Sequence, residues 1–245
     1  MTAIARIREL VRYVRPESGW IYRDARFLAA RVELDPVAAR VLPRGLSLSS
    51  PPRATVFVAH FPDTSFRSIY NEAGVFLHVR RWGSEAIHCP WMLVDDDVAL
   101  ITGRELLGYP KKLGRIELRE VGTRVHAEVE RKGDRVLEMT ATLGESDPTP
   151  PPMEGQTTYN VLGSIGFSVQ RLVKFAPREQ ILEARRARVE LVVHRAERDP
   201  ICDLGLGPVT SAHYYRLNLG AGVLPRPVAA VSPTYWVTHW TLRCH

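Results

Sequence analysis

The chain has 245 residues, of which 45% are hydrophobic and 24% are charged, and this composition is ordinary for a globular protein that buries a sizeable core. Its formal net charge is +6 at pH 7, but the basic residues are spread evenly and form no cluster with stacking aromatics, so we expect no nucleic-acid partner. No apolar run approaches the roughly 20 residues of a membrane-spanning helix, so we expect no membrane partner. The three cysteines have neither metal-ligand nor disulfide spacing, which predicts no metal site and a reducing, cytoplasmic location.

The predicted elements begin with an amphipathic helix over residues 1–15, in which apolar side chains recur at helical spacing. An arginine-rich targeting helix is the alternative, which Glu9 weakens, and the stretch lacks the small-residue cleavage site of a secretory signal. Short strand-like runs follow, at 53–61, 74–82, 91–102, 124–131 and 135–144. The last two runs alternate apolar and polar residues around the turn Lys132-Gly133-Asp134, which predicts a hairpin.

A proline-rich segment, DPTPPPMEG at 147–155, interrupts this pattern, and we interpret it as a crossing segment rather than a linker between domains. Beyond it, 186–198 and 227–245 again have strand-like patterns, whereas 178–186 is typical of either a short helix or the beginning of a strand. Many short strands with few helices predict a mostly β (α+β) chain, folded as a single domain over 1–245 around a closed or nearly closed antiparallel barrel.

An unusual pair of lysines lies in the stretch GRELLGYPKKLGRIEL, residues 103–118. The 33 basic residues include only four lysines, and two of these, Lys111 and Lys112, are adjacent. A lysine amine is a nucleophile only when it is neutral, and its reference pKa is about 10.4. Burial can lower that pKa by about 3–5 units, and a neighbouring cation acts in the same direction. The stretch offers both influences, because Leu106, Leu107, Tyr109 and Leu113 can supply apolar walls and Lys112 a second charge.

The backbone around the pair favours burial over charge as the dominant influence. Pro110 fixes its own φ and biases Tyr109 toward an extended conformation. In an extended segment successive side chains point to opposite faces, so Lys111 and Lys112 should not line the same pocket. The alternative interpretation is a pair of surface lysines after a turn.

The segment GRELLGYPKKLG, residues 103–114, resembles the signature of the acetoacetate decarboxylase family, in which a Gly-Arg-Glu stretch leads into a Pro-Lys-Lys element. Upstream, DTSFRSIYNEAG at 63–74 resembles the Asp-Thr-Ser segment of that family, which runs on to a glutamate. LVDDDVALITGRE at 93–105 resembles the strand that leads into the motif, and fainter similarity extends from about Tyr22 to the C-terminus.

The resemblance implies a role for each matching position. Lys111 matches the lysine that forms a Schiff base with the substrate, and Lys112 matches the neighbour that supports it. Glu72 matches an active-site glutamate that can carry a proton, and Arg104 and Glu105 match an ion pair of the motif. The family further implies an antiparallel β-barrel or cone, homo-oligomers, a small keto acid as substrate, and no metal or organic cofactor.

Departures from the family pattern bear on the substrate. The decarboxylases carry an arginine near the N-terminal strand, where this chain offers Arg23 and Arg26 but aligns Asp24. A second acidic position is Phe57 here, and aromatics near the C-terminus, with Tyr235 the first of them, would suit a larger apolar pocket. Arg23, Arg26, Phe57 and Tyr235 are therefore the candidate substrate-binding residues.

Three functions follow from this pattern. The first is a lyase that decarboxylates a β-keto acid, acetoacetate-like or larger, through an iminium and an enamine on Lys111. The second is an aldolase-dehydratase that condenses a 2-oxo acid such as pyruvate with an aldehyde. The third is a member of the superfamily that binds a small ligand without turnover.

Overall fold

The computed structural model describes residue 4 and residues 20–163, 169–221 and 225–244. The helix predicted over 1–15 therefore lies outside the described residues, except for Ile4. The described strands are β1 (Trp20–Leu34), β2 (Ser47–Leu48), β3 (Arg53–Phe61), β4 (Asp63–Thr64), β5 (Tyr70–Arg81), β6 (Ser84–Val94), β7 (Lys111–Leu113), β8 (Arg115–Val121), β9 (Arg124–Arg131), β10 (Asp134–Ser146), β11 (Thr158–Leu162), β12 (Arg171–Phe175), β13 (Arg178–Val193), β14 (Leu206–Ala221) and β15 (Arg226–Ala230). The helices are α2 (Asp97–Leu107) and α3 (Tyr235–Cys244), with 3₁₀ turns η1 (Pro36–Val41) and η2 (Ile201–Leu204).

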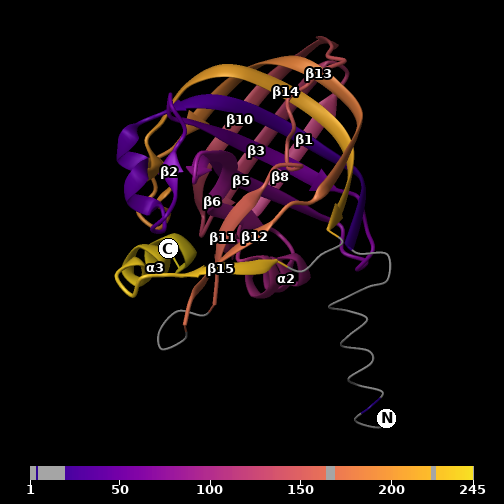
Figure 1. Ribbon diagram of the computed structural model, residues 1–245. Helices are drawn as coiled ribbons and strands as arrows, with labels where there is room; N and C mark the ends of the chain where they lie inside the picture. Colours follow the sequence, from indigo (N-terminus) through magenta and orange to yellow (C-terminus); the bar gives the residue numbers. More distant parts are fainter. Residues whose placement is uncertain (1–3, 5–19, 164–168, 222–224, 245) are drawn as a thin grey trace.

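The strands form one strongly bent sheet, which confirms the mostly β prediction (Figure 1). Its order is β15-β12-β11-β6-β5-β3-β1-β14-β13-β10-β9-β8, and β2, β4 and β7 pair at its side with β5, β1 and β6. Within the described residues the two end strands, β15 and β8, do not pair, so the sheet is not the closed barrel that we predicted. It is also not wholly antiparallel, because β6 pairs in parallel with both β7 and β11.

The strand alternation divides the interior into two apolar clusters, one on each face of the central strands. On β1, Leu28 and Ala30 belong to one cluster and Phe27 and Ala29 to the other. We call these the Leu28 cluster and the Phe27 cluster. The two clusters arise because consecutive side chains of a strand point to opposite faces of the sheet. The middle parts of β1, β3 and β5 are therefore apolar at consecutive positions rather than at alternate ones.

Two predicted strands are partly helical in the structure. The run 91–102 is strand only as far as Val94, and α2 begins at Asp97. The Asp96 carboxylate accepts a hydrogen bond from the Ala99 N–H at 2.7 Å, and this N-cap satisfies a backbone donor that a strand would have paired elsewhere. Likewise only Arg226–Ala230 is strand in 227–245, and α3 follows. The ambiguous stretch 178–186 is part of β13, and the predicted hairpin is confirmed as β9–β10.

None of the helices in the described part of the chain is long and apolar enough to span a bilayer. Helices α2 and α3 lie together at one end of the bent sheet (Figure 1). Helix α2 and the short strand β7 that follows it bring the lysine pair to the centre of the sheet, beside β6.

Candidate active site

The paired lysines occupy a short strand in the middle of the fold, and their side chains leave it in opposite directions, as the extended backbone predicts. Helix α2 ends at Gly108, which has a left-handed φ of 70°, and β7 then pairs in parallel with β6, with Lys111 opposite Met92. The Lys111 side chain extends among residues of the Phe27 cluster, including Tyr70 and Tyr109. The Lys112 ammonium instead faces Trp91 of the Leu28 cluster.

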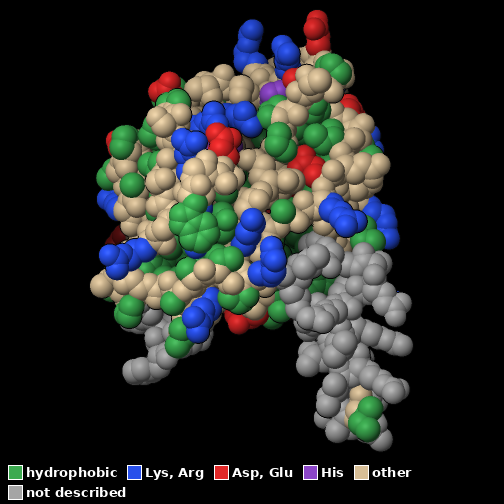
Figure 2. Space-filling model, viewed as in Figure 1, with side chains coloured by type: hydrophobic (Ala, Val, Ile, Leu, Met, Phe, Trp, Pro, Cys, Tyr) green, Lys and Arg blue, Asp and Glu red, His purple; other side chains and the backbone are tan. Residues whose placement is uncertain are grey.

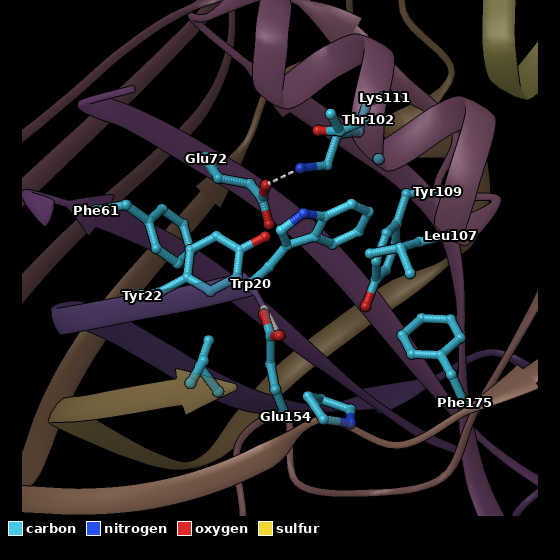
Figure 3. A pocket seen from close by; sticks show the side chains of 13 residues that line it. Trp20, Tyr22, Phe61, Glu72, Thr102, Leu107, Tyr109, Lys111, Glu154 and Phe175 are labelled. Carbon is cyan, nitrogen blue, oxygen red and sulfur yellow. Dashed lines mark hydrogen bonds and ion pairs between the residues drawn. The ribbon is translucent and has the colours of Figure 1, made fainter. Parts of the chain in front are cut away.

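The Lys111 amine forms an ion pair with Glu72 inside the protein (Figure 3). Its Nζ lies 2.5 Å from Glu72 Oε2, and the two side chains are only 7% and 5% exposed. The sheet brings these two side chains together, because β6 pairs with β5 on one side and with β7 on the other, so that Glu72 and Lys111 lie at the same end of β6. The pair therefore holds an amine and a proton acceptor in direct contact, away from bulk water.

Two phenol rings flank the amine. Lys111 Nζ lies 5.5 Å from the centre of the Tyr70 ring and 5.8 Å from that of Tyr109, distances at which a ring face attracts a cation. Burial, and to a lesser degree nearby carboxyl groups such as Glu72, raises the pKa of both phenols well above its usual value. Tyr70 and Tyr109 are therefore neutral at physiological pH, and they can act as hydrogen-bond groups but not as bases.

The Lys111 amine lines a small, partly enclosed cavity. Its walls are largely apolar (Figure 3). The lining residues are Trp20, Tyr22, Phe61, Glu72, Thr102, Gly103, Leu107, Tyr109, Lys111, Glu154, Phe175, Pro177 and Leu219. Among these described residues Lys111 is the only cation, and Glu72 and Glu154 are the only acids.

Glu154 is a cavity residue that the sequence reasoning missed. It lies in the proline-rich segment between β10 and β11, and its carboxyl group is directed into the cavity from the side opposite Lys111 and Glu72 (Figure 3). Burial, together with the nearby carboxylates of Glu72 and Glu179, raises the pKa of Glu154 to about 8. At pH 7 it is consequently a neutral acid that can donate a hydrogen bond. The available signal in the sequence was the position of this carboxylate, between a run of prolines and a glycine.

Glu179 on β13 holds the backbone of this segment in place. Its carboxylate accepts hydrogen bonds from the N–H groups of Met153 at 3.0 Å, Glu154 at 2.7 Å and Gly155 at 2.5 Å. Hydrogen bonds to a charged acceptor are roughly twice as strong as neutral ones. Three of them to one carboxylate therefore hold the backbone of this segment firmly. Glu179 therefore positions Glu154 at the cavity.

Lys112 belongs to a separate buried polar cluster. Its Nζ lies 3.1 Å from Asp199 Oδ2, and Asp199 also accepts hydrogen bonds from the Trp91 indole at 2.7 Å and from the Ile201 N–H at 3.0 Å. Arg131 lies 3.5 Å from the same carboxylate. Burial lowers the pKa of Lys112 to about 8, although Asp199 acts in the opposite direction. This cluster joins β7 to η2, and it does not reach the cavity.

We expect Lys112→Ala to lower the free energy of unfolding and to leave the reaction of the Lys111 amine largely unchanged. Removing one partner of a buried ion pair costs about 3–5 kcal/mol, and the lower end applies here because Arg131 remains beside Asp199. Urea unfolding should show this loss, while the Lys111 amine should still form a reducible adduct with a keto acid. Unchanged stability together with a lost adduct would instead place Lys112 in the chemistry.

Arg104 and Glu105, the motif residues before the lysines, do not contact each other as an ion pair. Arg104 donates a hydrogen bond to the Lys111 carbonyl oxygen at 3.0 Å and contacts the Arg243 carbonyl oxygen at 3.4 Å. Glu105 is exposed, and its carboxylate forms no ion pair with Arg104. The predicted ion pair is therefore wrong, because Arg104 points to backbone oxygens that hold β7 against α2 and α3.

The four candidate substrate-binding residues do not line this cavity. Arg23 is half exposed and pairs with Asp63 at 3.1 Å, and Arg26 contacts Asp24 at 3.6 Å and Glu120 at 3.7 Å. Phe57 is fully buried beneath Gly74, and the Tyr235 hydroxyl donates to the Val41 carbonyl oxygen at 3.2 Å. Within the described part of the chain, no group of three or more His, Cys, Asp or Glu side chains could hold a metal ion.

Comparison with known proteins matches most of the chain to one family. A family model described as acetoacetate decarboxylase matches residues 7–225. Acetoacetate decarboxylase 1 of Bradyrhizobium diazoefficiens is 32% identical over 101 residues, 41% of this chain and 40% of that protein. Acetoacetate decarboxylase of Clostridium botulinum is 35% identical over 75 residues, 31% of this chain and 30% of that protein. The alignments thus span less than half the length of these relatives.

Solved structures share the fold. The crystal structure of acetoacetate decarboxylase from Legionella pneumophila has a TM-score of 0.77 at 19% identity, over 89% of this chain and 90% of that one. The enduracididine biosynthesis enzyme MppR complexed with pyruvate has a TM-score of 0.76 at 21% identity, over 86% of this chain and 90% of that one.

Proposed function

Because the chain belongs to the acetoacetate decarboxylase family, we propose that it is a lyase that decarboxylates a β-keto acid through a Schiff base on Lys111. The observation that carries this proposal is the buried contact between the Lys111 amine and Glu72 in a cavity whose other walls are mostly apolar. The family establishes the class of protein, and the substrate and mechanism are inferred from the cavity.

The chemistry proceeds in steps that use the residues present. Glu72 takes a proton from the Lys111 ammonium, and the neutral amine adds to the ketone carbon of the substrate. Loss of the former carbonyl oxygen as water gives an iminium ion. The bond between the α-carbon and the carboxylate then breaks, its electron pair moves toward the iminium nitrogen, and CO₂ leaves an enamine. A proton delivered to the α-carbon, followed by addition of water to the iminium, releases the ketone product and restores the lysine.

The apolar walls support decarboxylation as the outcome. A carboxylate requires solvation or a cation, and Lys111 is the only cation among the described lining residues. The iminium keeps a positive charge that draws electrons from the breaking bond, and the other described wall residues, which include Trp20 and Phe175, offer the substrate carboxylate no second cation. CO₂ is neutral and requires no such partner, so the dry cavity favours the bond cleavage.

Release of CO₂ tests the proposal directly. The full chain should release CO₂ from at least one member of a series that extends from acetoacetate to longer and aryl-substituted β-keto acids. With borohydride present, the same substrate should add its reduced mass to a peptide that contains Lys111. If no member of the series gives CO₂ or an adduct, the cavity is a binding site without turnover.

A second candidate function rests on the two carboxyl groups at opposite sides of the cavity. An enamine formed from pyruvate could attack an aldehyde, and the neutral acid Glu154 could protonate the hydroxyl that leaves as water. The solved MppR structures include one complexed with the condensation product of pyruvate and imidazole 4-carboxaldehyde, although this likeness concerns the fold. Condensation of pyruvate with aldehydes in the absence of CO₂ release would favour this activity over decarboxylation.

We expect Glu154→Gln to change the pH dependence of the reaction. In the native protein Glu154 ionises as pH rises through about 8, which places a second negative charge opposite Glu72 and repels an anionic substrate. Wild-type kcat/KM should therefore fall above that pH, whereas the amide of the variant cannot ionise and this limb should be lost. The measurement is a kcat/KM profile between pH 6 and 9.5 for both proteins.

The pH dependence of the free energy of unfolding reports on Glu154 without requiring turnover. The folded chain retains the Glu154 proton that the unfolded chain releases from its usual pKa of 4.5, so the free energy of unfolding should fall as pH rises from 4.5 to about 8. Glu154→Gln should flatten this slope. Lys112 affects the free energy of unfolding only above about pH 8. Its pKa is lowered to about 8 in the folded chain, so above that pH the unfolded chain binds more protons at this residue. An identical slope in both proteins would show that Glu154 ionises normally.

A further inference from the structure

A second polar depression lies outside the cavity, beside the β5–β6 turn and strands β11, β12 and β15. Its lining residues are Arg81, Trp82, Ser84, Glu85, Thr157, Tyr159, Lys174, Arg226, Pro227 and Val228. It shares no residue with the cavity around Lys111. Strand β12 separates the two, because consecutive residues point to opposite faces: Phe175 lines the cavity and Lys174 lines the depression.

Arg81 is a buried cation that pairs with no acid among the residues that the structure describes. It is only 5% exposed, and two of its nitrogens, Nε and Nη1, are buried and have no hydrogen-bond partner. Its guanidinium carbon lies 4.2 Å from the centre of the Trp82 ring and 5.4 Å from that of the Tyr159 ring. Ring contacts offset only part of the penalty for burying an unpaired ion, so an anion at this position would be stabilised by Arg81.

Two other buried arginines, Arg131 and Arg243, each leave only Nε without a hydrogen-bond partner and use another nitrogen of the guanidinium as a donor. Arg131 donates to the Leu113 carbonyl oxygen at 2.7 Å and lies beside Asp199, and Arg243 donates to the Gly163 carbonyl oxygen at 3.0 Å. Arg81 has no equivalent contact with any described residue. The difference indicates that its donors are held for a ligand rather than for the fold.

Two more cations converge on the same depression through the sheet register. Lys174 is opposite Tyr159 on β11 and opposite Arg226 on β15, so the three side chains form a row across adjacent strands. Neither Lys174 nor Arg226 forms an ion pair within the described part of the chain, and the one acid that lines the depression, Glu85, is 74% exposed and pairs with Arg53 at 3.8 Å. Figure 2 shows basic side chains on the surface where β12 and β15 lie.

We propose that Arg81, Lys174 and Arg226 form a binding site for a compact polyanion, such as a phosphate ester or a small polycarboxylate. The guanidinium of Arg81 would supply a fixed charge at the base of the site, and Lys174 and Arg226 would neutralise the remaining charge of the anion. The outer face of Trp82, which is 86% exposed, borders the site and reports on its occupation through fluorescence.

Calorimetric titration of the full chain with pyrophosphate and, separately, with citrate tests the site at low ionic strength. At least one probe should bind with one-to-one stoichiometry and should bind more weakly as salt is added. The relative affinities of the two probes then distinguish a phosphate ligand from a polycarboxylate. Absence of saturable binding by both probes would overturn the proposal.

Variants locate the bound anion. Lys174→Ala and Arg226→Ala should each weaken binding by about tenfold or more, the effect of losing one charge-assisted hydrogen bond. Arg124→Ala, a matched change at an exposed arginine of β9, should leave the affinity within twofold, and Lys111→Ala should also leave it unchanged. Equal affinities for the wild type and for the Lys174 and Arg226 variants, or loss of binding in Lys111→Ala, would assign the anion elsewhere and overturn the proposal.

Discussion

Lys111→Ala is expected to reduce turnover to the uncatalysed background and to abolish the borohydride-trapped adduct. The reason is chemical, because the imine requires the Lys111 amine, and Lys112 is committed to Asp199 on the opposite face of the strand. Lys112 therefore cannot replace Lys111 without rearranging the core. The measurement is CO₂ release together with peptide mapping of the adduct, which is unambiguous because the chain has only four lysines.

A second variant separates lost chemistry from lost folding. Alanine leaves the buried Glu72 carboxylate unpaired, which can cost about 3–5 kcal/mol of stability and reduce activity for that reason alone. Lys111→Arg retains a cation for Glu72 but provides a guanidinium, which does not form an imine. A folded and inactive Lys111→Arg protein would support the assignment. An adduct that moves to Lys112, or turnover that persists in either variant, would contradict it.

Local sequence rules predicted the separation of the two lysines, since it depends only on an extended backbone. Pro110 limits its own φ, Tyr109 is biased toward an extended conformation, and alternation along β7 then sends Lys111 and Lys112 into different apolar clusters. The resemblance to the family placed Glu72 at the site, and the structure brings it within 2.5 Å of the amine. Propensity alone would not have found this contact.

The remaining features depend on long-range packing that the sequence pattern does not encode. Asp199 is 87 residues from Lys112 in the chain, and no local rule links the two. Glu154 enters the cavity because Glu179, on another strand, holds its backbone. The beginning of α2 was a different kind of error: the short apolar runs on either side of Asp95, Asp96 and Asp97 each fit a strand and a helix equally well, and the cap at Asp96 decides between them for the second run.

Gly103→Ala is expected to lower kcat by about 100-fold while leaving the fold intact, because a displacement of about 1 Å at a reacting group can have an effect of that size. Gly103 lies on α2 against the lysine side chain. A Cβ built at this position would be 2.5 Å from both Cδ and Cε of Lys111 and 3.1 Å from Nζ. The atoms in conflict are the flexible end of a side chain rather than backbone, so the amine would move away from Glu72 and the helix would stay.

Stability in this variant has two opposing contributions. Alanine inside a helix is more favourable than glycine by about 0.5–1 kcal/mol, whereas moving the Lys111 amine away from Glu72 weakens a buried ion pair. Thermal unfolding and kcat measured on the same preparation report stability and reaction separately, and Glu105→Ala, at an exposed position of α2, is the matched control. If Gly103→Ala kept full kcat, the position of the Lys111 amine beside Glu72 would not limit the reaction. A stable but slow variant would mean that the glycine in GRELLGYPKKLG is there to make room for the lysine.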